Sequence, residues 1–133
     1  MTSLIRTVLW LVLRVRLTGS LAPFDHAARL LVVANHHSSL DAVLLALFLP
    51  RNPVVVMSPA ECKGRLMQWL VRRFPHEFLD LNNATTVKRV LRLLRAGRPV
   101  VMFPEGRIAH HGAVMKIYAV PALIALRSGA TVL

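Results

Sequence analysis

Residues 29–49 read RLLVVANHHSSLDAVLLALFL. The first six residues form an apolar run rich in Leu and Val, which predicts a strand buried on both faces. The stretch from Asp41 to Leu49 is also largely apolar and is followed by Pro50, which predicts a helix that stops at the proline. A polar loop, residues 35–40, lies between them. A strand, a loop and a helix in this order are typical of an α/β fold.

The same alternation of strands and helices continues along the chain. Strands are predicted at residues 54–57, 78–81, 100–103 and 131–133, and helices at residues 62–73, 85–96 and 122–127. The helix that Thr85 or Thr86 caps and Gly97 ends has a regular apolar stripe with Lys and Arg outside it. We therefore expect an α/β fold with a mostly parallel sheet flanked by helices. Because residue 133 falls at the start of a strand, we also expect a C-terminally truncated domain.

The first segment of the chain, residues 1–18, is predicted to be an N-terminal membrane-interfacial helix ended by Gly19. Arg6, Arg14 and Arg16 interrupt its apolar residues, so no stretch approaches the ~20 apolar residues that a bilayer crossing needs. Arg14 and Arg16 also sit at the wrong end for a signal peptide. The alternative is a helix that simply packs on the core. Residues 19–133 are assigned to one further domain.

Charge and composition limit the possible partners. The chain is 55% hydrophobic and carries a formal charge of +11, which suits a protein lying on an anionic membrane. The charge would also attract an acidic carrier protein or nucleic acid. With 6% aromatic residues and no nucleic-acid-binding motif, we do not expect nucleic acid. Cys62 is the single cysteine, so no internal disulfide can form, which indicates a reducing compartment. The basic residues proposed to meet anionic partners are Arg72, Arg73, Lys88, Arg89, Arg92 and Arg95.

His36 and Asp41 are the candidate catalytic residues of the loop after the first strand. A hydroxyl is a weak nucleophile at neutral pH and needs a base beside it. An imidazole can act as that base, and a carboxylate on its other nitrogen fixes the tautomer and stabilises the imidazolium. On chemistry alone, His37 is as good a base as His36. In the alternative interpretation, Ser38 and Asp41 form a capping box and have no catalytic role.

No metal is expected at these histidines. His36 and His37, with His110 and His111, make two adjacent pairs, but the spacings of zinc sites are absent. The sequence offers no other metal-ligand pattern around Cys62.

A second polar cluster, Phe103-Pro104-Glu105-Gly106-Arg107, follows the strand at residues 100–103. Ligand contacts in α/β proteins are usual after a strand. Gly106 lets a ligand approach the backbone, Arg107 can hold a phosphate, and Glu105 can orient Arg107 or bond the acceptor. The alternative is a plain turn with a surface ion pair.

Asn35-His36-x4-Asp41 and Phe103 to Arg107, in this order, resemble the glycerolipid acyltransferase superfamily. The chain is most similar to the N-terminal acyltransferase domain of bifunctional acylglycerophosphoethanolamine acyltransferase/acyl-carrier-protein synthetases. The resemblance implies a glycerol-3-phosphate acyltransferase-like fold. Two departures stand out: residues 81–83 occupy the place where many relatives have an Arg, and residues 118–121 lack an expected Gly.

The same resemblance implies roles for individual residues. His36 becomes the base and Asp41 its partner, while Glu105, Gly106 and Arg107 become the acceptor-phosphate site, with Lys116 matching a weaker downstream position. No cofactor is implied, since the donor is a thioester of acyl carrier protein or of CoA. The acceptor would be a lysophospholipid, with lysophosphatidylethanolamine favoured, at the cytoplasmic face of the inner (plasma) membrane.

The function expected from the sequence is therefore acyl transfer from acyl carrier protein or CoA to a lysophospholipid hydroxyl, as part of phospholipid biosynthesis. The alternative is a catalytically inactive, truncated remnant of such an enzyme that only binds membrane.

Overall fold

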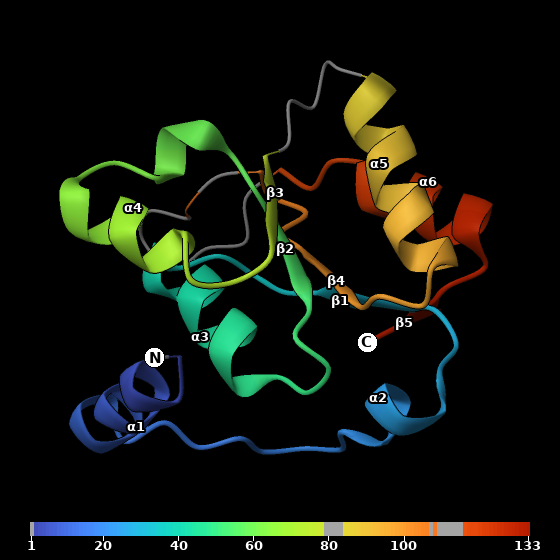
Figure 1. Ribbon diagram of the computed structural model, residues 1–133. Helices are drawn as coiled ribbons and strands as arrows, with labels where there is room; N and C mark the ends of the chain where they lie inside the picture. The colour runs from blue at the N-terminus through green and yellow to red at the C-terminus, as the bar shows by residue number, and fades with distance from the viewer. Residues whose placement is uncertain (1, 79–83, 107, 109–115) are drawn as a thin grey trace.

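Five parallel strands form a single sheet in the computed structural model, which describes residues 2–78, 84–106, 108 and 116–133 (Figure 1). The strand order is β3-β2-β4-β1-β5, and every pair of neighbours is parallel. The strands are β1 (Leu30–Val33), β2 (Val54–Met57), β3 (His76–Phe78), β4 (Val100–Met102) and β5 (Thr131–Val132). The α/β fold with a parallel sheet is therefore confirmed.

Helices cover both faces of the sheet, with α3 and α4 on one side and α5 and α6 on the other (Figure 1). The helices are α1 (Thr2–Leu13), α2 (Ala22–His26), α3 (Leu40–Phe48), α4 (Arg65–Val71), α5 (Ala84–Arg95) and α6 (Val120–Ser128), with a 3-10 turn η1 (Pro59–Glu61). The short helix α2 was not predicted, although Pro23 in its first turn is a recognised start signal.

Alternate side chains of β1, β2 and β4 enter two separate hydrophobic cores. In β4, Val101 points into the core beneath α3 and α4, whereas Val100 and Met102 point into the core beneath α5 and α6. This follows from the two-residue period of a strand. All three side chains are buried, so the centre of the sheet excludes water on both faces. The apolar runs of the sequence are the direct result of this double burial.

Several predicted boundaries were wrong. Helix α1 ends at Leu13 rather than near Gly19, because Arg14 adopts a left-handed backbone (φ 49°) that breaks the helical hydrogen-bond series. The helix predicted at residues 62–73 is shorter: α4 spans Arg65–Val71 and starts only after Gly64, whose φ is 87°. The 3-10 turn η1 precedes the predicted range.

Two further differences concern the strand and helix that follow. The third strand lies at His76–Phe78, which is earlier than the predicted 78–81, and residues 79–83 lie outside the described part of the chain. Thr85 and Thr86 lie inside the first turn of α5 rather than capping it. Gly97 follows α5 with a φ of 74°, as the predicted C-terminal glycine should.

Arg51 joins the parts of the chain that precede β1, β2 and β4. Its guanidinium donates hydrogen bonds to the carbonyls of Phe24 (2.9 Å), Ala27 (3.0 Å) and Gly97 (2.6 Å). Phe24 anchors α2 in the core that also contains α3. One arginine thus fastens the α2 region to the end of α5.

The strand order also determines where a ligand site can form. β1 and β4 are neighbours, with Val33 beside Met102. The chain leaves β1 towards α3 on one face, whereas α6, between β4 and β5, packs on the other face. Neighbouring parallel strands whose connections diverge in this way leave a crevice at their carboxyl ends. Both motifs of the sequence begin at that crevice.

Candidate active site

The His36 ring pairs with the Asp41 carboxylate at the carboxyl end of β1. His36 Nδ1 lies 3.2 Å from Asp41 Oδ2, and His36 is 1% exposed. Asp41 lies in the first turn of α3, so the strand-to-helix loop brings the two side chains together. When Nδ1 carries the proton, it donates to the carboxylate and leaves Nε2 as the basic nitrogen.

Asp41 also holds the backbone at the start of α3. Its Oδ2 accepts hydrogen bonds from the backbone N–H of His37 (2.7 Å) and of Ser38 (2.8 Å). The carboxylate therefore bonds backwards to the chain, as the capping interpretation required, and also meets the imidazole. The two interpretations of this motif are compatible, since one oxygen serves both.

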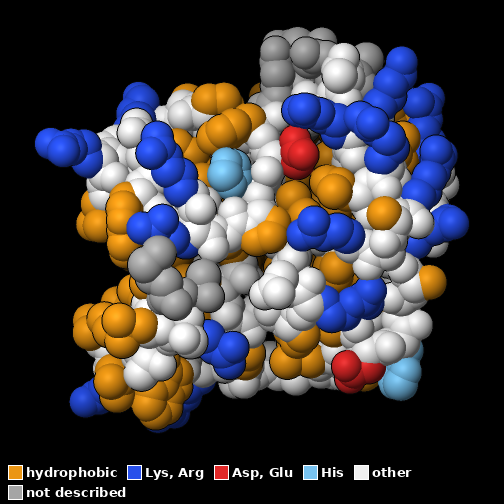
Figure 2. Space-filling model, in the orientation of Figure 1, with side chains coloured by type: hydrophobic (Ala, Val, Ile, Leu, Met, Phe, Trp, Pro, Cys, Tyr) orange, Lys and Arg blue, Asp and Glu red, His pale blue; other side chains and the backbone are white. Residues whose placement is uncertain are grey.

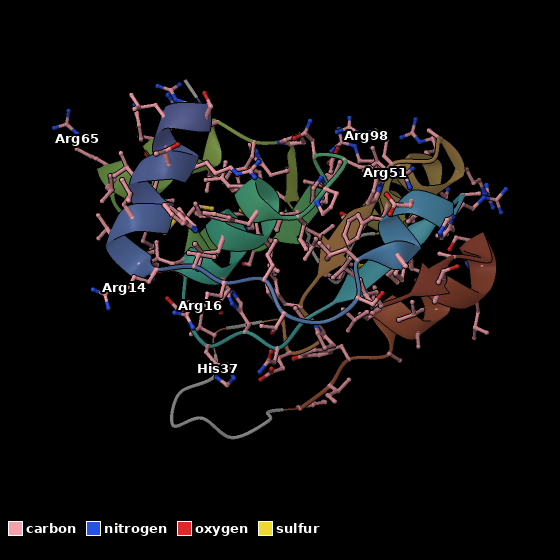
Figure 3. The ribbon with its side chains drawn as sticks, turned by 90° about the horizontal axis from the view of Figure 1, so that it is seen from below. Arg14, Arg16, His37, Arg51, Arg65 and Arg98 are labelled. Atoms are coloured by element: carbon pink, nitrogen blue, oxygen red, sulfur yellow. The ribbon has the colours of Figure 1, made fainter. Side chains whose placement is uncertain are left out.

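The neighbouring histidine occupies a different environment. His37 is exposed, and its Nε2 lies 2.6 Å from Asn35 Nδ2. It meets Asp41 through its backbone N–H, not through the ring contact that His36 makes. Figure 3 shows the His37 side chain at the edge of the loop. The geometry thus favours His36 as the base.

Residues after β4 hold His36 from the other side. The rings of His36 and Phe103 are stacked, with centroids 4.0 Å apart and planes inclined by 17°. Glu105 Oε1 accepts a hydrogen bond from the backbone N–H of His36 (3.3 Å), and Glu105 is 1% exposed. The sequence analysis missed both contacts. The available signal was that Phe103 and Glu105 follow a predicted strand, and this strand could lie next to β1.

The other predicted acceptor residues are only partly described. Gly106 has a φ of 62° and donates its backbone N–H to the Phe103 carbonyl (3.1 Å), which closes a tight turn. Lys116 is exposed, and the nearby Tyr118 N–H bonds to the Pro104 carbonyl (2.9 Å), so this segment lies beside the turn. Arg107 lies outside the described residues, and the orientation of Arg107 by Glu105 stays a prediction.

A narrow space lined mainly by apolar side chains adjoins the His36 ring. It measures about 10 Å³, room for about one water molecule, and its other walls are Ser39, Ala42, Met57, Cys62, Met67 and Val71. Cys62 and Val71 also line a second cavity of about 320 Å³ that reaches Arg72 and Phe78. Cys62 Sγ lies 3.4 Å from Met57 Sδ. Within the described residues, no cluster of three or more His, Cys, Asp or Glu could hold a metal ion.

Comparison with known proteins bears on the family and the fold of this chain. Residues 14–133 match the family described as Acyltransferase, so the chain belongs to this acyltransferase family. The chain is also similar to the crystal structure of the 1-acyl-sn-glycerophosphate (LPA) acyltransferase, PlsC, from Thermotoga maritima. The two share 25% sequence identity with a TM-score of 0.60. The match covers 78% of this chain and 42% of the Thermotoga chain.

These comparisons confirm the expected superfamily and its fold. The closer likeness to the bifunctional ethanolamine-lipid branch stays a prediction, as does the C-terminal truncation.

Proposed function

We propose that this chain is an O-acyltransferase domain that moves a fatty acyl group from a thioester to a hydroxyl of a lysophospholipid. The observation that carries the proposal is the pairing of buried His36 with partly buried Asp41, whose Nδ1 and Oδ2 lie 3.2 Å apart at the carboxyl end of β1. An imidazole held by a carboxylate is suited to take a proton from a hydroxyl. Family membership supports acyl transfer as the reaction.

In the proposed reaction, His36 Nε2 accepts the proton of the acceptor hydroxyl as the oxygen attacks the thioester carbonyl carbon. The tetrahedral intermediate then expels the thiolate, which takes the proton from the imidazolium. Asp41 stabilises the imidazolium between these steps. The acyl group passes directly between substrates, and Cys62 has no part in the transfer. Glu105 and Phe103 act as positioning residues, because they hold the backbone and the ring of His36.

The acceptor is proposed to place its phosphate at Gly106, Arg107 and Lys116. The tight turn after Phe103 lies at the crevice, and the segment of exposed Lys116 lies beside this turn and adds a positive charge. The solved structure with a similar fold is that of an enzyme for 1-acyl-sn-glycerophosphate, an acceptor with a phosphate on glycerol. Lysophosphatidylethanolamine is our preferred acceptor, from the resemblance of the motifs to the ethanolamine-lipid branch.

The donor is proposed to be acyl carrier protein or CoA carrying a fatty acyl group. The apolar walls shared by the space at His36 and the cavity near Phe78 support an acyl chain that runs past Cys62 and Val71. These side chains must shift, since the space at His36 is only about 10 Å³. Both donors are anionic, and Figure 2 shows Lys and Arg gathered over α5. Lys88, Arg89, Arg92 and Arg95 are exposed there.

A peripheral or monotopic position on the cytoplasmic face of the inner membrane is proposed for the chain. Helix α1 leaves large apolar side chains in solvent, among them Trp10 (54% exposed) and Leu11 (62%). Apolar atoms gather over this helix in Figure 2. In the described part of the chain, no helix is both long and apolar enough to cross a bilayer. A helix lying in the interface fits this combination.

Radiolabelled acyl transfer tests the proposal. The purified chain is incubated in detergent or vesicles with palmitoyl-carrier protein or palmitoyl-CoA and lysophosphatidylethanolamine. We expect turnover that His36→Ala abolishes and that His37→Ala, the exposed neighbour, retains. Full activity in His36→Ala would refute the base. Vesicle binding without turnover by the wild-type chain would favour the inactive remnant.

A further inference from the structure

Three arginines from separate parts of the chain line one cavity far from His36. The cavity measures about 700 Å³, and its cationic walls are Arg6 of α1, Arg73 after α4 and Arg98 before β4. Ser3, Thr7 and Asn52 add neutral hydrogen-bonding groups. Arginine side chains are well suited to bind the oxygens of a phosphate.

The described residues that line this cavity include no Asp or Glu to neutralise its three arginines. The Arg73 guanidinium lies over the Trp69 ring at 4.6 Å, and its buried Nε has no hydrogen-bond acceptor within the described chain. Three arginines that line one space give it positive charge, and like charges repel one another. An anion bound between the three arginines would remove this repulsion.

An apolar cavity adjoins the cationic one. It measures about 360 Å³ and is lined by Trp10, Val15, Leu17 and Phe48, together with Arg6 and Thr7, which line both cavities. The Arg6 guanidinium lies 5.8 Å from the centre of the Phe48 ring. The combined space therefore has a cationic part and an apolar part in contact. A ligand with an anionic head and a hydrocarbon tail would complement both.

The arginine cavity lies at the amino ends of the strands, opposite to the candidate active site at their carboxyl ends. Phe74 and Pro75, which line it, precede β3, and Arg98 precedes β4, whereas His36 and Glu105 follow β1 and β4. Figure 3 shows Arg98 and His37 on opposite sides of the molecule. The length of the strands thus separates the cavity from the acyl-transfer chemistry.

We propose that the two cavities form a second lipid site, which binds an anionic phospholipid. Its phosphate lies among Arg6, Arg73 and Arg98, and one hydrocarbon chain lies against Trp10 and Phe48. The lipid choice rests on the apolar half of the space and on the exposed apolar residues of α1 beside it. A bound lipid would fasten α1 to the domain. The site goes beyond the proposed acyl transfer and does not depend on it.

Calorimetry with short-chain lipids below their micelle concentration tests this site on the full chain. The probes are dihexanoyl phosphatidic acid, dihexanoyl phosphatidylcholine with the same chains, and inorganic phosphate. We expect phosphatidic acid to bind at least about tenfold more tightly than either of the others. Phosphatidylcholine carries a choline cation beside its phosphate, which the arginines repel, and inorganic phosphate has no hydrocarbon chain for the apolar half. If inorganic phosphate bound as tightly as phosphatidic acid, the lipid assignment would be overturned.

Variants locate the site. Arg73→Gln and Arg98→Gln should each weaken phosphatidic acid binding by about tenfold, the value of one hydrogen bond to a charged group. Arg127→Gln removes the same charge from α6, outside both cavities, and should bind as the wild type does. Lys116→Ala should also leave this affinity unchanged, because Lys116 lies at the candidate active site.

Two outcomes would refute the proposal. One is unchanged binding in both Arg73→Gln and Arg98→Gln; the other is binding lost only in Lys116→Ala, which would place the lipid at the acceptor site. Arg73→Lys keeps the charge and guards against misfolding. It should bind more tightly than Arg73→Gln, and equal affinities would also count against an electrostatic site.

Discussion

Replacing Asp41 separates the two tasks of its carboxylate. Asp41 Oδ2 lies 3.2 Å from His36 Nδ1 and accepts from the N–H groups of His37 and Ser38 at 2.7 and 2.8 Å. In Asp41→Asn the amide oxygen can still accept from the two backbone groups. The charge that stabilises the imidazolium is lost. Asp41→Ala removes all three interactions.

The expected magnitudes differ between stability and catalysis. Two charge-assisted bonds would suggest about 3–6 kcal/mol for Asp41→Ala. The side chain is 25% exposed, so water replaces part of the loss, and the measured range for helix caps of about 0.5–2 kcal/mol is the better guide. We expect a loss of about 2 kcal/mol for Asp41→Ala and about 1 kcal/mol for Asp41→Asn. Turnover should fall at least about 100-fold in both, since both disable the base.

Urea unfolding and acyl-transfer kinetics on the same preparations measure the two effects. Asp25→Asn, in the first turn of α2, is the matched control and should change neither the turnover nor the stability by a comparable amount. Wild-type turnover in Asp41→Asn would refute the catalytic pairing. Equal stability losses in Asp41→Asn and Asp41→Ala would refute the backbone-holding role.

Three more substitutions test the surrounding structure. Glu105→Ala removes an acceptor of the buried His36 N–H and should lower the free energy of unfolding in urea by about 1–3 kcal/mol. Glu105→Gln keeps an acceptor oxygen and should retain most of that stability. Equal losses in the two variants would contradict the hydrogen bond. Arg51→Ala breaks hydrogen bonds to three backbone carbonyls and should lower the free energy of unfolding by about 2–3 kcal/mol. Arg51→Lys should restore only part of this stability, because an ammonium group cannot reach all three carbonyls as the guanidinium does. Full stability in Arg51→Lys would argue against the three-carbonyl contact. Gly129→Ala should lower the free energy of unfolding by about 1–2 kcal/mol, because alanine is strained at the φ of 63° that Gly129 adopts. The added Cβ causes no clash, since its nearest atom lies at an ordinary 3.7 Å. An unchanged midpoint in thermal unfolding would refute that strain.

Strands β2 and β4 were predictable because they are buried on both faces. Residues 54–57 and 100–102 are apolar without interruption, and such runs identify buried parallel strands from the sequence alone. The end of α1 was not predictable, since nothing in the sequence indicates the left-handed backbone of Arg14. Helix α2 was missed because five residues are too few to show a helical period.

The candidate site was predictable only where its residues are close in sequence. The spacing of His36 and Asp41 predicted a pair that a single loop brings together. The bond from Glu105 to His36 spans 69 residues, and its existence depends on β4 lying next to β1. The alternation of strands and helices along the chain predicts a parallel sheet but does not determine the order of the strands in it. The stack of Phe103 on His36 was beyond sequence reasoning for the same reason.

One oxygen of Asp41 joins the start of α3 to the candidate base. Fraying of that first helical turn also breaks the contact between Asp41 and the imidazole, so heat or denaturant should lower turnover before the rest of the domain unfolds. Because one carboxylate has both roles, fewer substitutions in this turn can be tolerated. A substitution that loosens this turn to admit a bulkier acceptor also disorients the base, so new acceptor specificity is more readily gained at the turn after β4.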